Sequence, residues 1–129
     1  MSTPFRLLVV EDNPSDREFV SEAVAEYGDG IELVLAASSA EAVLAVRQDP
    51  PPDLALVDLH LGHECGLSLV PRLGVPAAIL STTNDPVQRE IALAAGARAF
   101  LTKPLRFEGY RALLVLVRAL ADPLSLIHI

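Results

Sequence analysis

The sequence contains no tryptophan, a single cysteine, Cys65, and few aromatic residues (5%). One cysteine excludes an internal disulfide bond. No apolar run is long enough to span a bilayer, and the N-terminus lacks the apolar stretch of a signal peptide. We therefore expect a reducing, cytoplasmic setting without a membrane partner.

Basic residues are also scarce, because ten Lys and Arg stand against seventeen Asp and Glu, which gives a net charge of −7. Clustered Lys and Arg are needed to contact nucleic-acid phosphates, so we expect no direct binding of nucleic acid. Hydrophobic residues are abundant, at 51% of 129 residues. With so few aromatics, the core must be built from Val, Leu, Ile and Ala, which favours one α/β domain over a β-sandwich.

Five short apolar runs alternate along the chain with five segments of helical periodicity. The predicted strands are Arg6–Val10, Ile31–Ala37, Leu54–Val57, Ala77–Leu80 and Ala99–Leu101, and the predicted helices are Ser15–Tyr27, Ser39–Gln48, Leu67–Leu73, Pro86–Ala95 and Phe107–Ala121. Right-handed crossovers then predict a doubly wound, flavodoxin-like α/β fold. Its five-stranded parallel sheet has the order 2-1-3-4-5, with five helices on two faces, in one domain over residues 1–123.

Ionisable or hydroxyl side chains follow four of the five predicted strands: Glu11 with Asp12, then Asp58, Ser81 and Lys103. In such sheets ligands bind beyond the carboxyl ends of the strands. The first and third strands would be neighbours about 4.8 Å apart, which brings the three carboxylates into one pocket. Three carboxylates repel one another unless a cation joins them, and Mg²⁺ is the cation that prefers such hard oxygen ligands.

Asp58 is the candidate nucleophile of this pocket. Carboxylates attack phosphorus to form an aspartyl phosphate, while Mg²⁺ and a lysine neutralise the charge on the phosphoryl oxygens. Lys103 is the only lysine in the chain. The hydroxyl of Ser81 can donate to a phosphate oxygen and convert the presence of phosphate into a side-chain movement.

Together these motifs resemble those of response-regulator receiver domains, over residues 6 to about 121. The resemblance rests on four segments: Leu7–Pro14, Leu56–Leu59 with Gly66, Ile79–Thr82 and Gly96–Pro104. It implies that Asp58 is the phospho-acceptor of a two-component system. It also implies that Glu11, Asp12, Asp58 and the backbone carbonyl of His60 hold Mg²⁺.

The same resemblance implies a switch and its partners. Ser81 and Phe100 would be the switch residues, Lys103 would bind the phosphoryl group, and the Lys103–Pro104 peptide bond would be cis. The phosphoryl donor would be a sensor histidine kinase or a phosphotransfer protein. The output face would comprise the fourth helix, fifth strand and fifth helix, and a homodimer through this face is one expected state.

The final predicted helix has a wider apolar stripe than one buried face needs, because Val115 and Leu116 extend it. Burial on both sides of the helix or dimerisation through it would explain the excess, and both explanations stay open.

Three features depart from the pattern of the resembled family. Gly62 stands where the family often has proline, so we expect a looser loop after Asp58. The spacing from Asp58 to Ser81 is several residues short, which leaves the length of the third helix open. His60 and Thr83 occupy positions that resemble those tuning phosphate lifetime, so the rate of dephosphorylation stays open too.

Other functions compete with this interpretation. The loop from His60 to Cys65 contains two histidines and a cysteine and could be interpreted as a transition-metal site, although its spacing matches no zinc pattern. A flavodoxin-like nucleotide binder would need backbone donors where Glu11 and Asp12 stand. The remaining alternatives are a small Mg²⁺-dependent phosphatase with an aspartate nucleophile and a receiver-shaped interaction module that is never phosphorylated.

Residues 124–129, Leu-Ser-Leu-Ile-His-Ile, form an apolar tail that the domain pattern does not require. They resemble the translation of a transposase adapter used in making sequencing libraries. We interpret them as a non-native addition or as a genuine short packing tail. On the first interpretation, an effector domain after Pro123 would be missing from this sequence.

Overall fold

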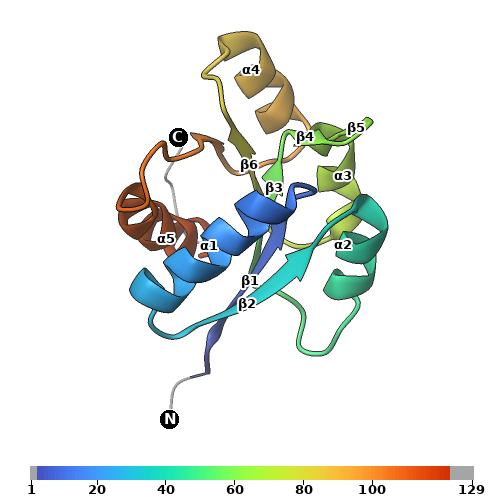
Figure 1. Cartoon of the computed structure of the whole chain (residues 1–129). Coiled ribbons are helices and arrows are strands. Elements are labelled where there is room, and N and C mark those ends of the chain that lie inside the picture. The colour runs from blue at the N-terminus through green and yellow to red at the C-terminus, as the bar shows by residue number, and fades with distance from the viewer. Residues whose placement is uncertain (1–2, 123–129) are drawn as a thin grey trace.

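The computed structural model describes residues 3–122 and places a parallel sheet between two layers of helices (Figure 1). The elements in chain order are β1 (Phe5–Val10), α1 (Pro14–Tyr27), β2 (Ile31–Ala36), α2 (Ser39–Val46), β3 (Leu54–Asp58), β4 (His60–Leu61), β5 (Glu64–Cys65), α3 (Gly66–Leu73), β6 (Ala77–Ser81), α4 (Pro86–Ala94), β7 (Phe100–Thr102) and α5 (Gly109–Leu120). The predicted five strands and five helices are all present.

The main sheet has the strand order β2-β1-β3-β6-β7, and all four of its pairings are parallel. This is the predicted order 2-1-3-4-5, so the doubly wound fold is confirmed. The registers align Val10 with Val57 and Ser81 with Thr102. The direction of winding reverses between β1 and β3, so the β1–α1 turn and the end of β3 lie side by side at the carboxyl edge of the sheet.

Alternate residues of the central strands supply two separate cores, since successive side chains of a strand point to opposite faces. On one face, Leu7 and Val9 pack with buried residues of α1 and α5. On the other face, Leu8 and Val10 pack with buried residues of α2, α3 and α4. Both faces of the sheet are covered, which explains why the strands read as continuous apolar runs.

Local signals place the helix starts near the site. Asn13 caps α1 by accepting hydrogen bonds from the backbone N–H groups of Ser15 (2.8 Å) and Asp16 (3.3 Å). Asp85 caps α4 in the same way, and each helix has proline in its first turn. These are the residue types that satisfy unpaired N–H groups at a helix start.

The loop after Asp58 is an antiparallel hairpin rather than the looser loop that Gly62 suggested. Strands β4 and β5 pair His60 with Cys65 and Leu61 with Glu64. Gly62 adopts a φ of 61° in the turn, where a residue with a side chain would be strained. Two-residue strands give too little periodicity to be recognised in the sequence, because their pairing depends on the turn between them.

Gly66 begins α3, which has eight residues. A Cβ atom at this position would lie 2.1 Å from the backbone oxygen of Asp58. The glycine therefore allows α3 to start directly against the end of β3. The short spacing between Asp58 and Ser81 is accommodated by this compact hairpin and helix.

Two further expectations need correction. Val115 of α5 is 68% exposed, so this helix is not buried on both sides within one chain. The Lys103–Pro104 bond is not cis, because the one cis peptide bond among residues 3–122 joins Asp49 to Pro50. Tertiary contacts decide the isomer, since a residue–proline bond favours trans by only about 0.5–1 kcal/mol.

The tail interpretation falls on residues 124–129, which lie outside the described residues. Among the helices described, none combines the length and the apolar character that a membrane span requires.

Candidate functional site

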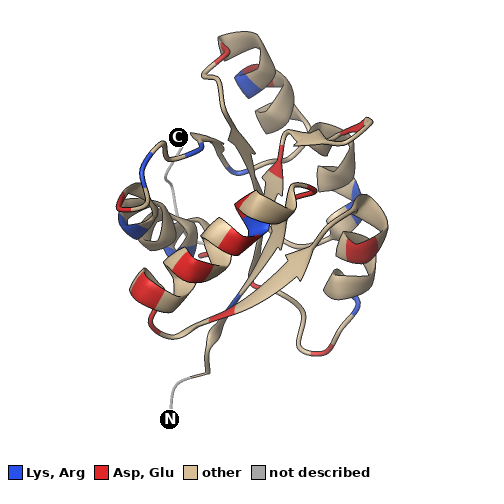
Figure 2. Ribbon diagram, in the orientation of Figure 1, with Lys and Arg blue, Asp and Glu red and all other residues tan. Residues whose placement is uncertain are grey.

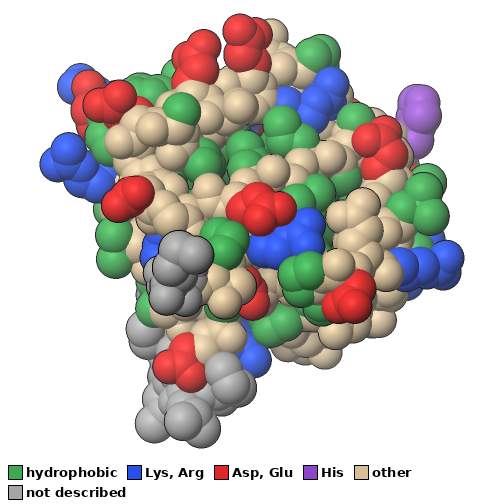
Figure 3. Space-filling view, turned by 90° about the horizontal axis from the view of Figure 1, so that it is seen from below, with side chains coloured by type: hydrophobic (Ala, Val, Ile, Leu, Met, Phe, Trp, Pro, Cys, Tyr) green, Lys and Arg blue, Asp and Glu red, His purple; other side chains and the backbone are tan. Residues whose placement is uncertain are grey.

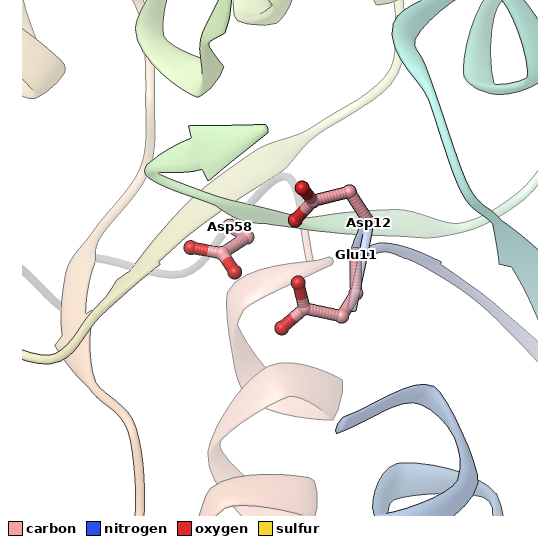
Figure 4. Close-up of side chains that lie close together, drawn as sticks. All are labelled: Glu11, Asp12 and Asp58. Carbon is pink, nitrogen blue, oxygen red and sulfur yellow. The ribbon is translucent and has the colours of Figure 1, made fainter. Parts of the chain in front are cut away.

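Three carboxylates meet at the carboxyl edge of the sheet. Glu11 and Asp12 follow β1, and Asp58 ends β3, and one oxygen from each lies within 4.8 Å of the others. Figure 4 shows the carboxylates of Glu11 and Asp12 directed to the side on which Asp58 lies. Glu11 is 3% exposed and Asp58 is 9% exposed, whereas Asp12 is exposed. The predicted acid cluster therefore forms, with one member facing solvent.

The β1–α1 turn holds the acid pair in this position. The backbone N–H of Glu11 continues the sheet by donating to the Ala36 carbonyl at 2.9 Å. The N–H of Asn13 donates to Glu11 Oε2 at 3.3 Å. Arg17 of α1 donates from its Nη1 to the backbone carbonyls of Glu11 and Asp12, each at 2.9 Å.

Lys103 brings the only lysine of the chain into the same cluster. Its Nζ donates to Glu11 Oε1 at 2.6 Å, to Asp58 Oδ2 at 2.9 Å and to Asp16 Oδ2 at 3.3 Å. Its own backbone N–H donates to the Ser81 carbonyl at 2.7 Å. One ammonium group thus faces three carboxylates, which leaves the site with an excess of negative charge.

Burial and the neighbouring groups change the acidity of Glu11 and Lys103. Burial, followed by the hydrogen bond to Asp58, raises the pKa of Glu11 from 4.5 to about 8, although Lys103 acts in the opposite direction. Burial lowers the pKa of Lys103, but its hydrogen bonds to Glu11 and Asp58 outweigh that effect and raise it above its ordinary value. Lys103 is therefore charged at neutral pH, and Glu11 favours a proton or a cation.

Ser81 ends β6 and Phe100 begins the neighbouring strand β7. Ser81 is 1% exposed, and its Oγ accepts a hydrogen bond from the Thr83 N–H at 3.1 Å. Phe100 is 2% exposed, and the Arg89 guanidinium of α4 lies 5.9 Å from the centroid of its ring. Both side chains are buried, and Phe100 contacts α4 through Arg89.

His60 lies two residues after Asp58, with its side chain exposed and its backbone N–H donating to Asp58 Oδ1 at 3.1 Å. The transition-metal alternative receives no support. Within residues 3–122, the one group of three or more potential metal-ligating side chains is Glu11, Asp12 and Asp58. Glu64 of the hairpin instead accepts a hydrogen bond from Ser39 of α2.

The acid cluster suits a hard divalent cation by the chemistry of its donors. It offers three carboxylate oxygens within 4.8 Å of one another, and carboxylate oxygens are ligands that such cations prefer. Sequence reasoning identified these donors because each follows a strand. It missed Asp16 and Arg17, whose contacts depend on how α1 packs, although their places in the first turns of a helix beside the acid pair were visible.

A model of the response regulator receiver domain matches residues 7–114 of the sequence. The chain belongs to the response regulator receiver family. Receiver domains are the signal-receiving modules of two-component systems, and the fold and acid cluster agree with that membership.

Curated relatives of this receiver domain include transcriptional regulators. It is 33% identical over 106 residues to the transcriptional regulatory protein AruR of Pseudomonas aeruginosa, covering 78% of this chain and 43% of AruR. It is 32% identical over 108 residues to the transcriptional regulatory protein PhoP of Escherichia coli, covering 80% of this chain and 47% of PhoP. The chain therefore spans less than half the length of these relatives.

Solved receiver structures match almost over their full length. The chemotaxis protein CheY4 of Vibrio cholerae gives a TM-score of 0.77 at 26% identity, covering 88% of this chain and 98% of CheY4. The receiver domain of NarL from Mycobacterium tuberculosis gives a TM-score of 0.75 at 25% identity, covering 91% and 98%. The structural match therefore covers most of this chain and nearly all of each solved receiver domain, which agrees with the family assignment.

Proposed function

We propose that this receiver domain takes a phosphoryl group onto Asp58 in a Mg²⁺-dependent reaction. The observation that carries the proposal is the contact between Lys103 Nζ and Asp58 Oδ2 at 2.9 Å, inside a cluster of three carboxylates. Glu11, Asp12, Asp58 and the backbone carbonyl of His60 would hold the ion. When bound, Mg²⁺ would supply the positive charge that the site lacks.

In the proposed reaction, a carboxylate oxygen of Asp58 forms a bond to phosphorus while the bond from phosphorus to the donor breaks. With a phosphohistidine donor, the leaving imidazole takes up a proton. Lys103 neutralises charge on the phosphoryl oxygens, and it can do so because its pKa keeps it protonated. The donor would be a sensor histidine kinase or a phosphotransfer protein, consistent with the family.

The test is incubation with Mg²⁺ and acetyl phosphate, followed by intact mass measurement. Wild type should gain the mass of one phosphoryl group, Asp58→Asn should gain none, and a chelator should prevent the gain. Asp29→Asn is the matched control, because Asp29 is an exposed aspartate outside the cluster. A wild type that stays unmodified while another receiver is phosphorylated would refute the proposal, and so would modification of Asp58→Asn.

We further propose that Ser81 and Phe100 transmit the modification. Ser81 Oγ is engaged with the Thr83 N–H at 3.1 Å, so donating its hydroxyl to a phosphoryl oxygen on Asp58 would rearrange the turn that leads into α4. Phe100 contacts α4 through Arg89, so it would move with that turn. The expected output is a change in the face made by α4, β7 and α5.

Exposed apolar side chains on this face support a homodimer as one output. On α4, Val87 is 64% exposed and Ile91 is 50% exposed. Light scattering with beryllofluoride, which mimics the phosphoryl group, should show dimerisation of wild type and not of Ile91→Glu. Leu44→Glu is the control, since Leu44 is a comparably exposed side chain on α2. If the protein stays monomeric in all conditions, the dimer proposal is wrong, and the phosphorylation proposal is unaffected.

A further inference from the structure

Arg17 holds three consecutive backbone carbonyls at the turn that carries the acid pair. Its Nη1 donates to the carbonyls of Glu11 and Asp12, both at 2.9 Å, and its backbone N–H donates to the carbonyl of Asn13 at 3.0 Å. One residue of α1 therefore fixes the path of the chain from the end of β1 into the helix. The carboxylates of Glu11 and Asp12 project from that same path.

The two acidic residues depend on Arg17 to different degrees. Glu11 is also held by its N–H bond to Ala36 and by its carboxylate contact with Lys103. For Asp12, the structure shows a single donor to the backbone carbonyl within residues 3–122, and that donor is Arg17. Asp12 is also the exposed member of the cluster. Its position is therefore the more sensitive to the loss of the arginine.

Electrostatic repulsion among the carboxylates explains why the hydrogen bonds from Arg17 matter. Glu11, Asp12 and Asp58 have oxygens within 4.8 Å of one another, so the repulsion between them when they are ionised favours moving the β1–α1 turn away from β3. Each hydrogen bond from a charged guanidinium contributes more than a neutral one. Two such bonds to adjacent carbonyls oppose the repulsion without occupying any carboxylate oxygen that a cation would need.

We infer that Arg17 is a positioning residue for the metal-binding acid pair, acting through the backbone of Glu11 and Asp12 rather than by contact with the ion. The inference rests on the proposed Mg²⁺ site and adds a determinant of its affinity. Supporting partners of metal ligands commonly change metal affinity by 10–100-fold. We expect about a tenfold loss of Mg²⁺ affinity when the guanidinium is removed.

The experiment is calorimetric titration of Mg²⁺ into wild type, Arg17→Gln and Arg72→Gln. Arg72 is an exposed arginine on α3, so its replacement removes the same charge away from the acid pair. Arg17→Gln should bind Mg²⁺ about tenfold more weakly than wild type, and Arg72→Gln should bind within twofold of it. Equal losses in the two variants, or no loss in either, would overturn the inference.

A second measurement does not need the metal. In the metal-free protein, the amide NMR shifts of Asp12 and Asn13 should change in Arg17→Gln and stay unchanged in Arg72→Gln. If wild type fails to bind Mg²⁺, the proposed metal site is wrong, and the shifts alone decide whether Arg17 positions the turn. Unchanged shifts at both residues would then reject its role.

Folding of the variants is checked by thermal unfolding. A lower stability of Arg17→Gln with unchanged Mg²⁺ affinity would show a role in the fold only, which also overturns the inference. If Arg17→Gln does not fold, Arg17→Met decides instead, because it keeps an apolar stem and removes the donor nitrogen that reaches both carbonyls. A threefold or larger loss of affinity is expected for it, and wild-type affinity would reject the inference.

Discussion

At the carboxyl end of the sheet Lys103 lies among three carboxylates, whereas at the amino end Arg98 contacts two backbone carbonyls. Lys103 contacts Glu11, Asp58 and Asp16. Arg98 donates to the carbonyls of Leu120 at 2.6 Å and Asp122 at 2.9 Å, and thereby closes the end of α5. The first arrangement leaves more carboxylates than ammonium groups, and the second satisfies polar groups of the fold itself.

The distribution of charged residues also differs between the two ends. Figure 2 places acidic segments in the β1–α1 turn, at the end of β3 and along α1. Figure 3 looks at the opposite end of the molecule, where acidic, basic and apolar side chains are interspersed over the visible surface. Burial and local excess of one sign therefore distinguish the candidate site from an ordinary charged surface.

The largest expected effect concerns two glycines, one at each end. Gly66→Ala would place a Cβ 2.1 Å from the Asp58 carbonyl oxygen, whereas a Cβ at Gly74 meets nothing within 4 Å. We expect Gly66→Ala to lower the free energy of unfolding by roughly 4 kcal/mol. Gly74→Ala should cost about 1–2 kcal/mol, because only its φ of 71° is unfavourable. Urea unfolding measures both, and equal costs would contradict the close approach at Asp58.

The second prediction concerns pH in the absence of metal. The folded-state pKa of Glu11 is about 8, above its ordinary value of 4.5, so the folded chain holds a proton that the unfolded chain releases. This contribution to stability is complete below pH 4.5 and is lost as the pH rises to 8. Within that window the stability of wild type should fall with rising pH relative to that of Glu11→Gln. Parallel pH profiles for the two proteins would exclude the shift.

The third prediction compares the cations of the two ends. Lys103→Gln leaves buried carboxylates without their ammonium partner, and we expect a loss of about 2–3 kcal/mol in metal-free protein. Arg98→Gln removes hydrogen bonds to carbonyls at the molecular surface and should cost about 1 kcal/mol. Added Mg²⁺ should restore part of the stability of Lys103→Gln and none of that lost in Arg98→Gln. Thermal unfolding with and without Mg²⁺ provides the measurement.

The smallest effects are expected at half-exposed ion pairs. Asp16 pairs with Lys103 at 3.3 Å with 47% of its side chain exposed, and Glu32 pairs with Arg6 at 3.5 Å with 51% exposed. Exposed pairs contribute about 0.2–1 kcal/mol. Asp16→Asn and Glu32→Gln should each change the free energy of unfolding by about 0.5 kcal/mol or less. A much larger effect of Asp16→Asn would extend the candidate site into α1.

Most of the fold could be predicted because its strands are continuous apolar runs and its helices carry recognisable caps. The hairpin of β4 and β5 could not, since it contains two residues on each side and depends on the turn at Gly62. The acid cluster was predictable because Glu11, Asp12 and Asp58 end strands that parallel topology must bring together. The contacts of Arg17 and Asp16 could not be predicted, because they depend on how α1 is oriented against the sheet.

The sequence by itself determined the fold class, the family and the residues that gather at the carboxyl edge, because hydrophobic periodicity fixes which segments pair and therefore which ends meet. Only the tertiary structure decided how those residues interact. It placed the single ammonium of Lys103 against three carboxylates and raised the pKa of Glu11 through burial. It also brought three backbone carbonyls of one turn within hydrogen-bond distance of Arg17. Distances and burial arise from packing between segments far apart in the chain, which no local pattern encodes.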